Sequence, residues 1–122
     1  MKRPEQSLHI QVANYLRVAL RPPTFWTSIE HATKLGPVAA AMRKKRGVKA
    51  GLPDILIMHP LDLATDVIGI ELKAKAGGLS DPQKEMRRTF IGCNADYVEC
   101  RSLDEVIGTL ELFGIPLHAK LS

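Results

Sequence analysis

Three absences narrow the possible classes of this protein. No apolar run approaches the roughly 18 residues that a membrane-spanning helix needs, so no membrane contact is expected. The first residues are polar and charged, unlike the apolar core of a signal peptide. The chain has only two cysteines, Cys93 and Cys100, without CxxC spacing, which argues against a disulfide scaffold and a zinc ribbon. We therefore expect a cytoplasmic protein in a reducing environment.

Acidic residues are absent from one long segment, between His31 and Pro53. This segment contains six basic residues, which are Lys34, Arg43, Lys44, Lys45, Arg46 and Lys49. The rest of the chain carries 11 basic and 13 acidic residues, although the net charge of the whole chain is +4. A domain that confines its positive charge to one segment is a candidate for binding a polyanion such as DNA. The alternative is a solvated basic loop, and charge alone does not separate the two.

The composition is that of an ordinary globular domain. The 122 residues are 45% hydrophobic and 25% charged, which argues against disorder and allows one sizeable core. No internal repeat or linker divides the chain, so we expect a single domain over residues 1–122.

Apolar spacing and turn residues predict eight elements in the order α-β-α-β-β-α-β-α. Helices are expected at 4–20, 37–46, 81–92 and 103–113, and strands at 24–29, 54–58, 66–73 and 97–101. Ser80 with Gln83 and Ser102 with Glu105 form capping boxes that open the last two helices. His59-Pro60 is expected to end the second strand. This order indicates an α/β fold with a mixed central sheet flanked by helices, and Phe25 is expected in its core.

Two of the predicted strands carry charged residues that their pairing would bring together. Asp54 opens one strand, and the triplet Glu71-Leu72-Lys73 closes the next. Alternation along a strand places Glu71 and Lys73 on one face and Leu72 on the other. The short connection allows an antiparallel hairpin, in which Asp54 lies near Glu71. Two carboxylates and an ammonium group would then meet at one end of the sheet.

This combination is typical of metal-dependent phosphodiester hydrolysis. Carboxylate oxygens are hard ligands suited to Mg²⁺, which keeps several waters and accepts phosphate oxygens. The ion can polarise a phosphoryl oxygen and lower the pKa of a bound water, and a nearby lysine can stabilise the developing charge. The alternatives are a surface ion pair between Glu71 and Lys73, worth about 0.5 kcal/mol, and a simple turn role for Asp54.

Two longer segments extend the pattern, namely KRGVKAGLPDILI at residues 45–57 and IELKAKAGGLSDPQ at residues 70–83. Both resemble the catalytic core of VRR-NUC domains, which belong to the PD-(D/E)xK nuclease superfamily. The resemblance extends over nearly the whole chain, and the short format is similar to stand-alone phage and bacterial members. It implies a restriction-endonuclease-like fold, and a bacterial cytoplasm or, for a phage gene, the cytoplasm of its host.

The resemblance also implies roles for the residues of the triplet and its partner. Asp54 and Glu71 match the acids that bind a metal, Mg²⁺ or Mn²⁺, and Lys73 matches the catalytic lysine. The backbone carbonyl of Leu72 would be a further metal ligand.

Two further matches each have a structural alternative. Glu5 matches a metal-binding acid of the first helix and shares a helical face with Val12 and Leu16, but an acid in a first turn also favours the helix dipole. Gln83 matches a glutamine that the family places after the triplet, where it would contact the water, the lysine or the phosphate. Its alternative is a purely structural part in the capping box of Ser80.

The expected DNA contacts lie in the basic segment and in the loop after the triplet. They are Lys34, Arg43, Lys44, Lys45, Arg46, Lys49 and Lys75, the last beside Gly77-Gly78, where the alternative is a flexible surface loop. The charges just beyond the site, Lys84, Arg87 and Arg88, are interpreted as solvated helix charges, with contacts to phosphates as the alternative.

Together, these features and the resemblance imply a Mg²⁺- or Mn²⁺-dependent DNA endonuclease acting on branched DNA such as Holliday junctions. Symmetrical cutting of two strands needs two sites, so we expect a homodimer. One alternative is a non-catalytic or non-specific DNA-binding module that retains the nuclease fold. The other is a small interaction domain whose acids form surface ion pairs.

Overall fold

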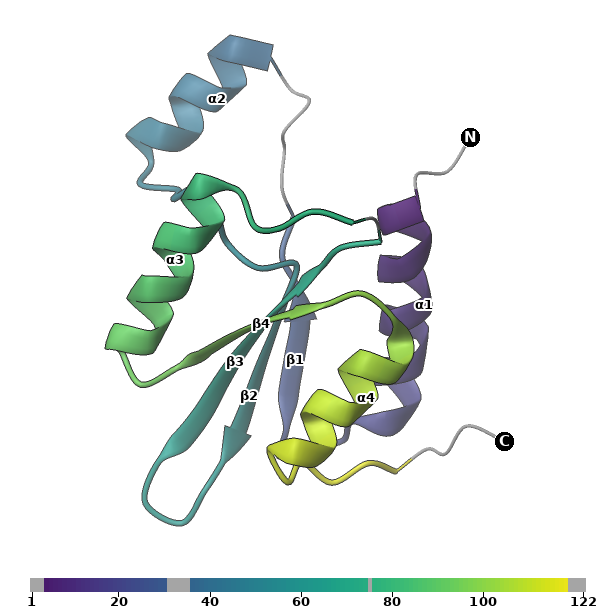
Figure 1. The fold of residues 1–122 in the computed structure, drawn as a ribbon. Coiled ribbons are helices and arrows are strands. Elements are labelled where there is room, and N and C mark those ends of the chain that lie inside the picture. Colours follow the sequence, from purple (N-terminus) through teal and green to yellow (C-terminus); the bar gives the residue numbers. More distant parts are fainter. Residues whose placement is uncertain (1–3, 31–35, 75, 119–122) are drawn as a thin grey trace.

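The structure is a computed structural model that describes residues 4–30, 36–74 and 76–118 (Figure 1). In this part of the chain no helix has the length and apolar character required to cross a membrane. The helices are α1 (Pro4–Ala19), α2 (Gly36–Lys45), α3 (Asp81–Gly92) and α4 (Leu103–Leu112). The strands are β1 (Phe25–Ser28), β2 (Ile55–Pro60), β3 (Thr65–Leu72) and β4 (Asp96–Cys100). The predicted order of elements is therefore confirmed.

The strands form one mixed sheet with the order β1-β2-β3-β4. β2 pairs antiparallel with both β1 and β3, so the expected hairpin is present. Its register joins Ile55 to Ile70. β4 pairs parallel with β3, because α3 carries the chain back to the start of the sheet, and Glu71 lies opposite Glu99. This register puts the end of β3 between the start of β2 and the end of β4.

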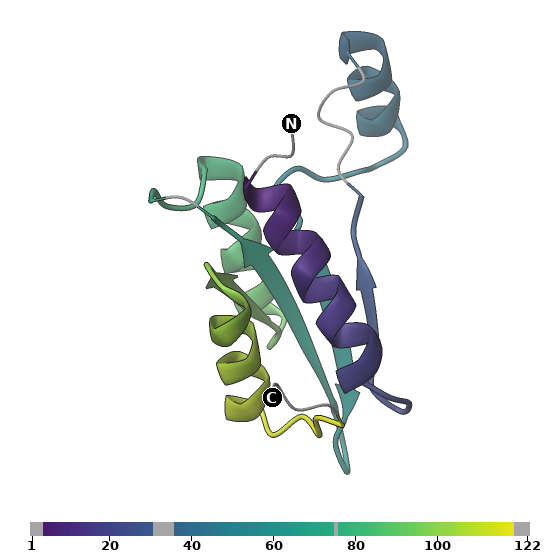
Figure 2. The same cartoon turned by 90° about the vertical axis from the view of Figure 1, so that its right-hand side faces the viewer.

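One face of the sheet packs against α1 and α4. The strands contribute alternate residues to this core, because every second side chain points to the same face. The buried core residues from the two helices and three strands are Leu8, Val12, Tyr15, Leu16, Ala19, Val106, Leu110, Ile55, Ile57, Ile68, Ile70, Leu72 and Cys100. Figure 2 shows α1 lying along the sheet with α4 beside it. Leu72 thus anchors the end of β3 and directs its neighbours, residues 71 and 73, to the opposite face.

The opposite face packs against α3. Phe90 of α3 meets Tyr97 of β4 edge-on, with ring centroids 5.5 Å apart. Gly69 lies beneath them, and a Cβ there would lie only 2.6 Å from Cγ of Pro53 and 2.9 Å from Cε2 of Phe90. The missing side chain therefore allows α3 and the turn before β2 to approach β3 closely.

Two expectations for the strands are wrong. β2 continues through His59 to Pro60, which lies opposite Thr65. The proline is tolerated because β1 ends its pairing at Met58, so the missing N–H of Pro60 faces no strand on that side. Phe25 is 52% exposed, because it begins an edge strand and alternates with Trp26, which packs against the core.

α2 stands apart from the other elements. None of its residues is buried, and Figures 1 and 2 both show it projecting beyond the end of the sheet. Its last turn carries Arg43, Lys44 and Lys45 without an acid in its first turn. The basic residues of α2 therefore have no role in packing the core.

Candidate active site

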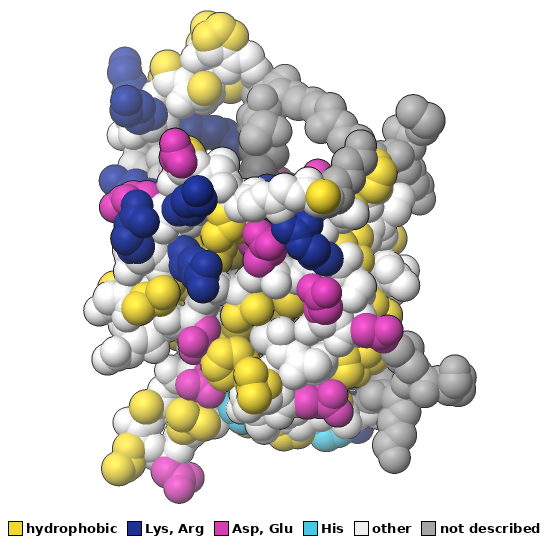
Figure 3. Space-filling view, viewed as in Figure 1, with side chains coloured by type: hydrophobic (Ala, Val, Ile, Leu, Met, Phe, Trp, Pro, Cys, Tyr) yellow, Lys and Arg dark blue, Asp and Glu magenta, His cyan; other side chains and the backbone are white. Residues whose placement is uncertain are grey.

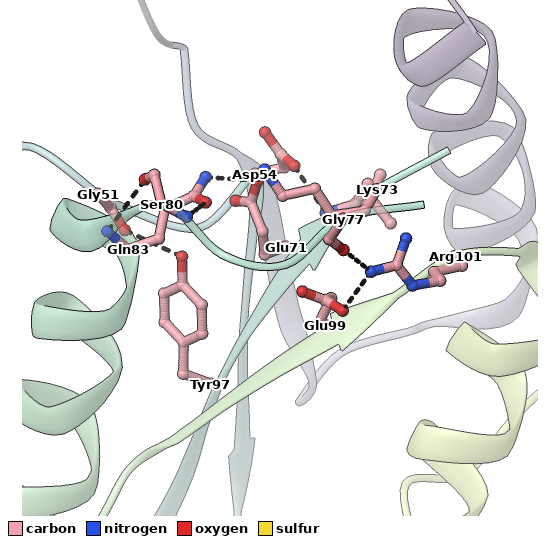
Figure 4. A network of polar contacts seen from close by, with 11 residues as sticks. Gly51, Asp54, Glu71, Lys73, Gly77, Ser80, Gln83, Tyr97, Glu99 and Arg101 are labelled. Atoms are coloured by element: carbon pink, nitrogen blue, oxygen red, sulfur yellow. Dashed lines mark hydrogen bonds and ion pairs between the residues drawn. The ribbon is translucent and has the colours of Figure 1, made fainter. Parts of the chain in front are cut away.

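The antiparallel register of β2 and β3 brings Asp54 next to Glu71. Asp54 immediately precedes Ile55, and Glu71 immediately follows Ile70, the partner of Ile55. Oδ2 of Asp54 accepts a hydrogen bond of 2.8 Å from the backbone N–H of Leu72, which fixes the carboxylate at the end of β3 (Figure 4). The meeting of the two acids, predicted from the hairpin, is therefore present.

Glu71 is a buried acid, with 4% of its surface exposed. Its Oε2 accepts a 2.8 Å hydrogen bond from Nε2 of Gln83 and lies 3.7 Å from Nζ of Lys73. Its Oε1 is buried without a hydrogen-bond partner among the described residues. Burial and the neighbouring charge of Asp54 raise the pKa of Glu71 to about 8, although Lys73 and Gln83 lower it. A second carboxylate is thus held in a place where its charge is poorly compensated.

Gln83 forms the capping box that was its structural alternative, and it also contacts Glu71, a partner that the sequence did not indicate. Its Oε1 accepts from the backbone N–H of Ser80 at 2.9 Å, and its own N–H donates to Oγ of Ser80 at 3.3 Å. This capping box starts α3. The amide nitrogen at the same side-chain end then donates to Glu71. The start of α3 and the orientation of the buried acid are therefore coupled through one side chain.

A cleft of about 660 Å³ opens over these residues. It is lined by residues of α1, of the loop before β2, of the end of β3 and of the start of α3, and these include Glu5, His9, Gly51, Asp54, Glu71, Leu72, Lys73, Ser80 and Gln83. The start of α1 thus forms one wall and the start of α3 forms the other. A cleft of this size admits a segment of a larger substrate.

Glu5 lies on the wall of the cleft and not within the carboxylate pair. The side chain is exposed, in the first turn of α1. Among the residues that the structure describes, no three His, Cys, Asp or Glu side chains gather closely enough to hold a metal ion. The pair of acids is therefore Asp54 and Glu71, and the role of Glu5 as a metal ligand stays a prediction.

Tyr97 supports the loop that carries Asp54, a role that the sequence did not reveal. Its hydroxyl donates a 3.0 Å hydrogen bond to the carbonyl of Gly51. Burial, together with the charge of Glu71, raises the pKa of Tyr97, so the hydroxyl keeps its proton as a donor. Gly51 has φ +83°, and a Cβ there would lie 2.2 Å from the carbonyl oxygen of Pro82. Only glycine fits between the tyrosine and the start of α3.

Arg101 ties the end of β4 to the loop between β3 and α3. Its guanidinium donates to Oε1 of Glu99 at 2.8 Å and also to the carbonyl of Gly77 (Figure 4). Glu99 lies opposite Glu71 in the parallel pairing, yet it is committed to this ion pair. These contacts depend on the parallel register of β3 and β4, which no local sequence pattern predicts.

The predicted DNA-binding residues that the structure describes do not line the cleft but belong to the helix and loop that lead to it. Arg43, Lys44 and Lys45 end α2, and Arg46 and Lys49 follow in the chain toward Gly51, a cleft residue. Lys34 and Lys75, the other two predicted contacts, lie outside the described residues.

Comparisons with known proteins agree with this geometry. The sequence profile of the family described as VRR-NUC domain matches residues 22–104. A solved structure described as a VRR-NUC domain protein superposes with a TM-score of 0.66 at 22% identity, over 93% of this chain and 89% of that one. A comparison with curated proteins found no match.

Proposed function

The chain belongs to the VRR-NUC domain family and is thus a nuclease-type, DNA-processing domain, and we propose that it is an endonuclease that hydrolyses DNA phosphodiesters with Mg²⁺ or Mn²⁺. The observation that supports this most strongly is the carboxylate pair of Asp54 and Glu71 with Lys73 beside it, all three lining one cleft. We further propose that residues 1–122 form one such domain.

The donor set of the cleft fits a hard divalent ion. Oε1 of Glu71 is buried with no hydrogen bond among the described residues, although an oxygen in that position normally has a partner. A raised pKa beside a second acid is what a missing positive charge would produce. Asp54, Glu71 and the carbonyl of Leu72 would hold the ion, with Glu5 as a further ligand from the wall. When bound, the ion supplies Lewis-acid polarisation of the phosphodiester and a more acidic water.

The other site residues have roles that follow from their contacts. Nζ of Lys73 lies 3.7 Å from Glu71, with 21% of the side chain exposed, so it can face a phosphate while it remains near the acids. It would stabilise the negative charge that develops on the phosphate. Gln83 holds the Glu71 carboxylate in one orientation through its 2.8 Å hydrogen bond. Its capping-box contacts reduce the freedom of the amide, which preorganises the acid.

We propose branched DNA, such as a Holliday junction, as the substrate and a homodimer as the active form. One chain carries one such cleft among its described residues, so paired cuts in two strands require a second copy. Arg43, Lys44, Lys45, Arg46 and Lys49 are proposed to hold the DNA backbone, since they lie in the last turn of α2 and in the loop that leads from it to the cleft, and α2 buries no residue. Lys34 and Lys75 remain proposed contacts from the sequence.

Two single substitutions test the catalytic part of this proposal. Asp54→Asn and Lys73→Ala should each abolish metal-dependent cleavage and leave the affinity for DNA within a few fold of the unsubstituted chain, because neither belongs to α2. Binding would be measured by fluorescence anisotropy in EDTA, and cleavage on labelled DNA with Mg²⁺ or Mn²⁺. Full cleavage by either variant would refute the assignment. Salt-sensitive binding with no cutting by the unsubstituted chain would instead identify a non-catalytic DNA-binding module.

A further inference from the structure

The outward side of α3 carries a stripe of positive charge that the fold does not use. Lys84, Arg87 and Arg88 are exposed, whereas Met86 and Phe90 on the other side are partly buried. Positions three and four apart lie on one side of a helix, so the three basic residues share a surface. Arg88 pairs with Glu85 at 2.7 Å. Lys84 and Arg87 form no ion pair with any other residue that the structure describes.

This stripe continues the basic surface of α2 past the cleft. The loop from α2 passes Lys49 and reaches Gly51, which is packed against the backbone of Pro82 at the start of α3. Gly51 and Gln83, the residue directly before Lys84, both line the cleft. Figure 3 shows Lys and Arg side chains gathered over α2 and α3 on one side of the molecule. The two basic surfaces therefore meet at the wall of the cleft that α3 forms.

Among the described residues, neither the α1 wall of the cleft nor α4, which lies outside it, offers such a surface. α4 carries Asp104, Glu105 and Glu111 and has no basic residue. The wall formed by α1 presents Glu5. Among the described residues, a polyanion approaching the cleft would therefore be attracted more strongly to the α2 and α3 side than to the α1 side.

We propose that the outward face of α3, through Lys84 and Arg87, is a second contact for the DNA backbone. One duplex arm runs from α2 over the Gly51 loop and along α3, with the cleft at its edge. This inference rests on the proposed function and extends it, because it states on which side of the cleft the arm lies. Since the contacts are charge to phosphate, they are independent of DNA sequence.

Salt-dependent binding tests this arrangement. Anisotropy of labelled duplex and four-way junction DNA would be measured in EDTA at several salt concentrations, for the unsubstituted chain and for K84Q/R87Q. Each phosphate contact adds about 0.9 to the slope of log affinity against log salt, so the double variant should lower the slope by about 2. In about 0.1 M salt the affinity should fall by roughly 60-fold, equally on unrelated sequences.

A matched control separates this contact from a simple loss of net charge. R17Q/R21Q removes the same charge at the end of α1 remote from the cleft, where both residues are exposed, and should change the slope little. Thermal unfolding should be the same for both double variants and the unsubstituted chain. An unchanged slope in K84Q/R87Q, or an equal loss in both double variants, would overturn the α3 contact alone. An unsubstituted chain that neither binds nor cuts DNA would refute the proposed function itself.

Discussion

Replacing Glu71 by Gln is expected to raise the free energy of unfolding of the metal-free protein while it removes cleavage. The buried carboxylate of Glu71 lies beside the charge of Asp54, and among the described residues only Lys73 and Gln83 compensate it. Glutamine has almost the same shape. Its oxygen can still accept the hydrogen bond from Gln83, and its nitrogen can donate toward the other acid. The substitution therefore replaces a group whose ionised form is disfavoured by burial and by Asp54 with a neutral group, without creating a cavity.

The size of this effect follows from the pKa of Glu71, which rises from an ordinary 4.5 to about 8 in the folded protein. Between these values the folded state binds a proton that the unfolded state has released, so stability falls as the pH rises. Each pH unit above 4.5 costs about 1.4 kcal/mol until the folded pKa is reached. Near pH 7 the ionisable side chain therefore destabilises the fold by about 3 kcal/mol relative to a neutral one of the same shape.

The assay is urea unfolding in EDTA at several pH values. Glu71→Gln should exceed the unsubstituted chain by less than about 1 kcal/mol near pH 5 and by about 3 kcal/mol near pH 7. Glu99→Gln is the matched control, because Glu99 lies opposite Glu71 but is paired with Arg101 at 2.8 Å. It should give no gain that grows with pH. A Glu71→Gln variant that is no more stable near pH 7, or whose gain does not change with pH, would refute this account of the site.

Three further substitutions or conditions give independent tests. Saturating Mn²⁺, at about 100 times its dissociation constant, should raise the free energy of unfolding in urea by about 2.7 kcal/mol. The Asp54→Asn variant should not show this increase in the same measurement. Gly51→Ala should destabilise by about 2–4 kcal/mol in urea, because its positive φ and the 2.2 Å approach to the α3 backbone both oppose a side chain. Gly47→Ala, with φ +86° and open space, should lose only about 1–2 kcal/mol, and equal losses would contradict the packing argument. Gln83→Ala should lose about 1 kcal/mol and also slow cleavage, whereas Ser102→Ala, which uncaps α4, should lose similar stability at an unchanged rate.

The parts of the site that follow from local rules could be predicted from the sequence. The short connection between residues 60 and 65 makes an antiparallel hairpin the natural pairing, and alternation then brings Asp54 to Glu71. Ser80 and Gln83 start α3 through a capping box of fixed spacing. The order of elements and the mixed sheet are also as predicted.

The parts that depend on contacts between distant segments could not be predicted in this way. The parallel register of β3 and β4 places Tyr97 below Gly51 and Arg101 near Gly77, and no spacing in the sequence encodes it. The second contact of Gln83, with Glu71, likewise arises only when α3 packs on the sheet. Phe25 is exposed because it lies on an edge strand. Strand propensity predicts that a residue lies in a strand, but not whether that strand is at the edge of the sheet.

The most direct test of the central claim is cleavage of a labelled four-way junction, compared with linear duplex and single-stranded DNA, in Mg²⁺, Mn²⁺ and EDTA. We expect paired, symmetrical cuts in the junction with either ion and none in EDTA, by the unsubstituted chain and not by Asp54→Asn. Cutting of every substrate would keep the nuclease but contradict the preference for branched DNA. No cutting with either ion, in a chain that binds the junction, would contradict the catalytic role of Asp54, Glu71 and Lys73.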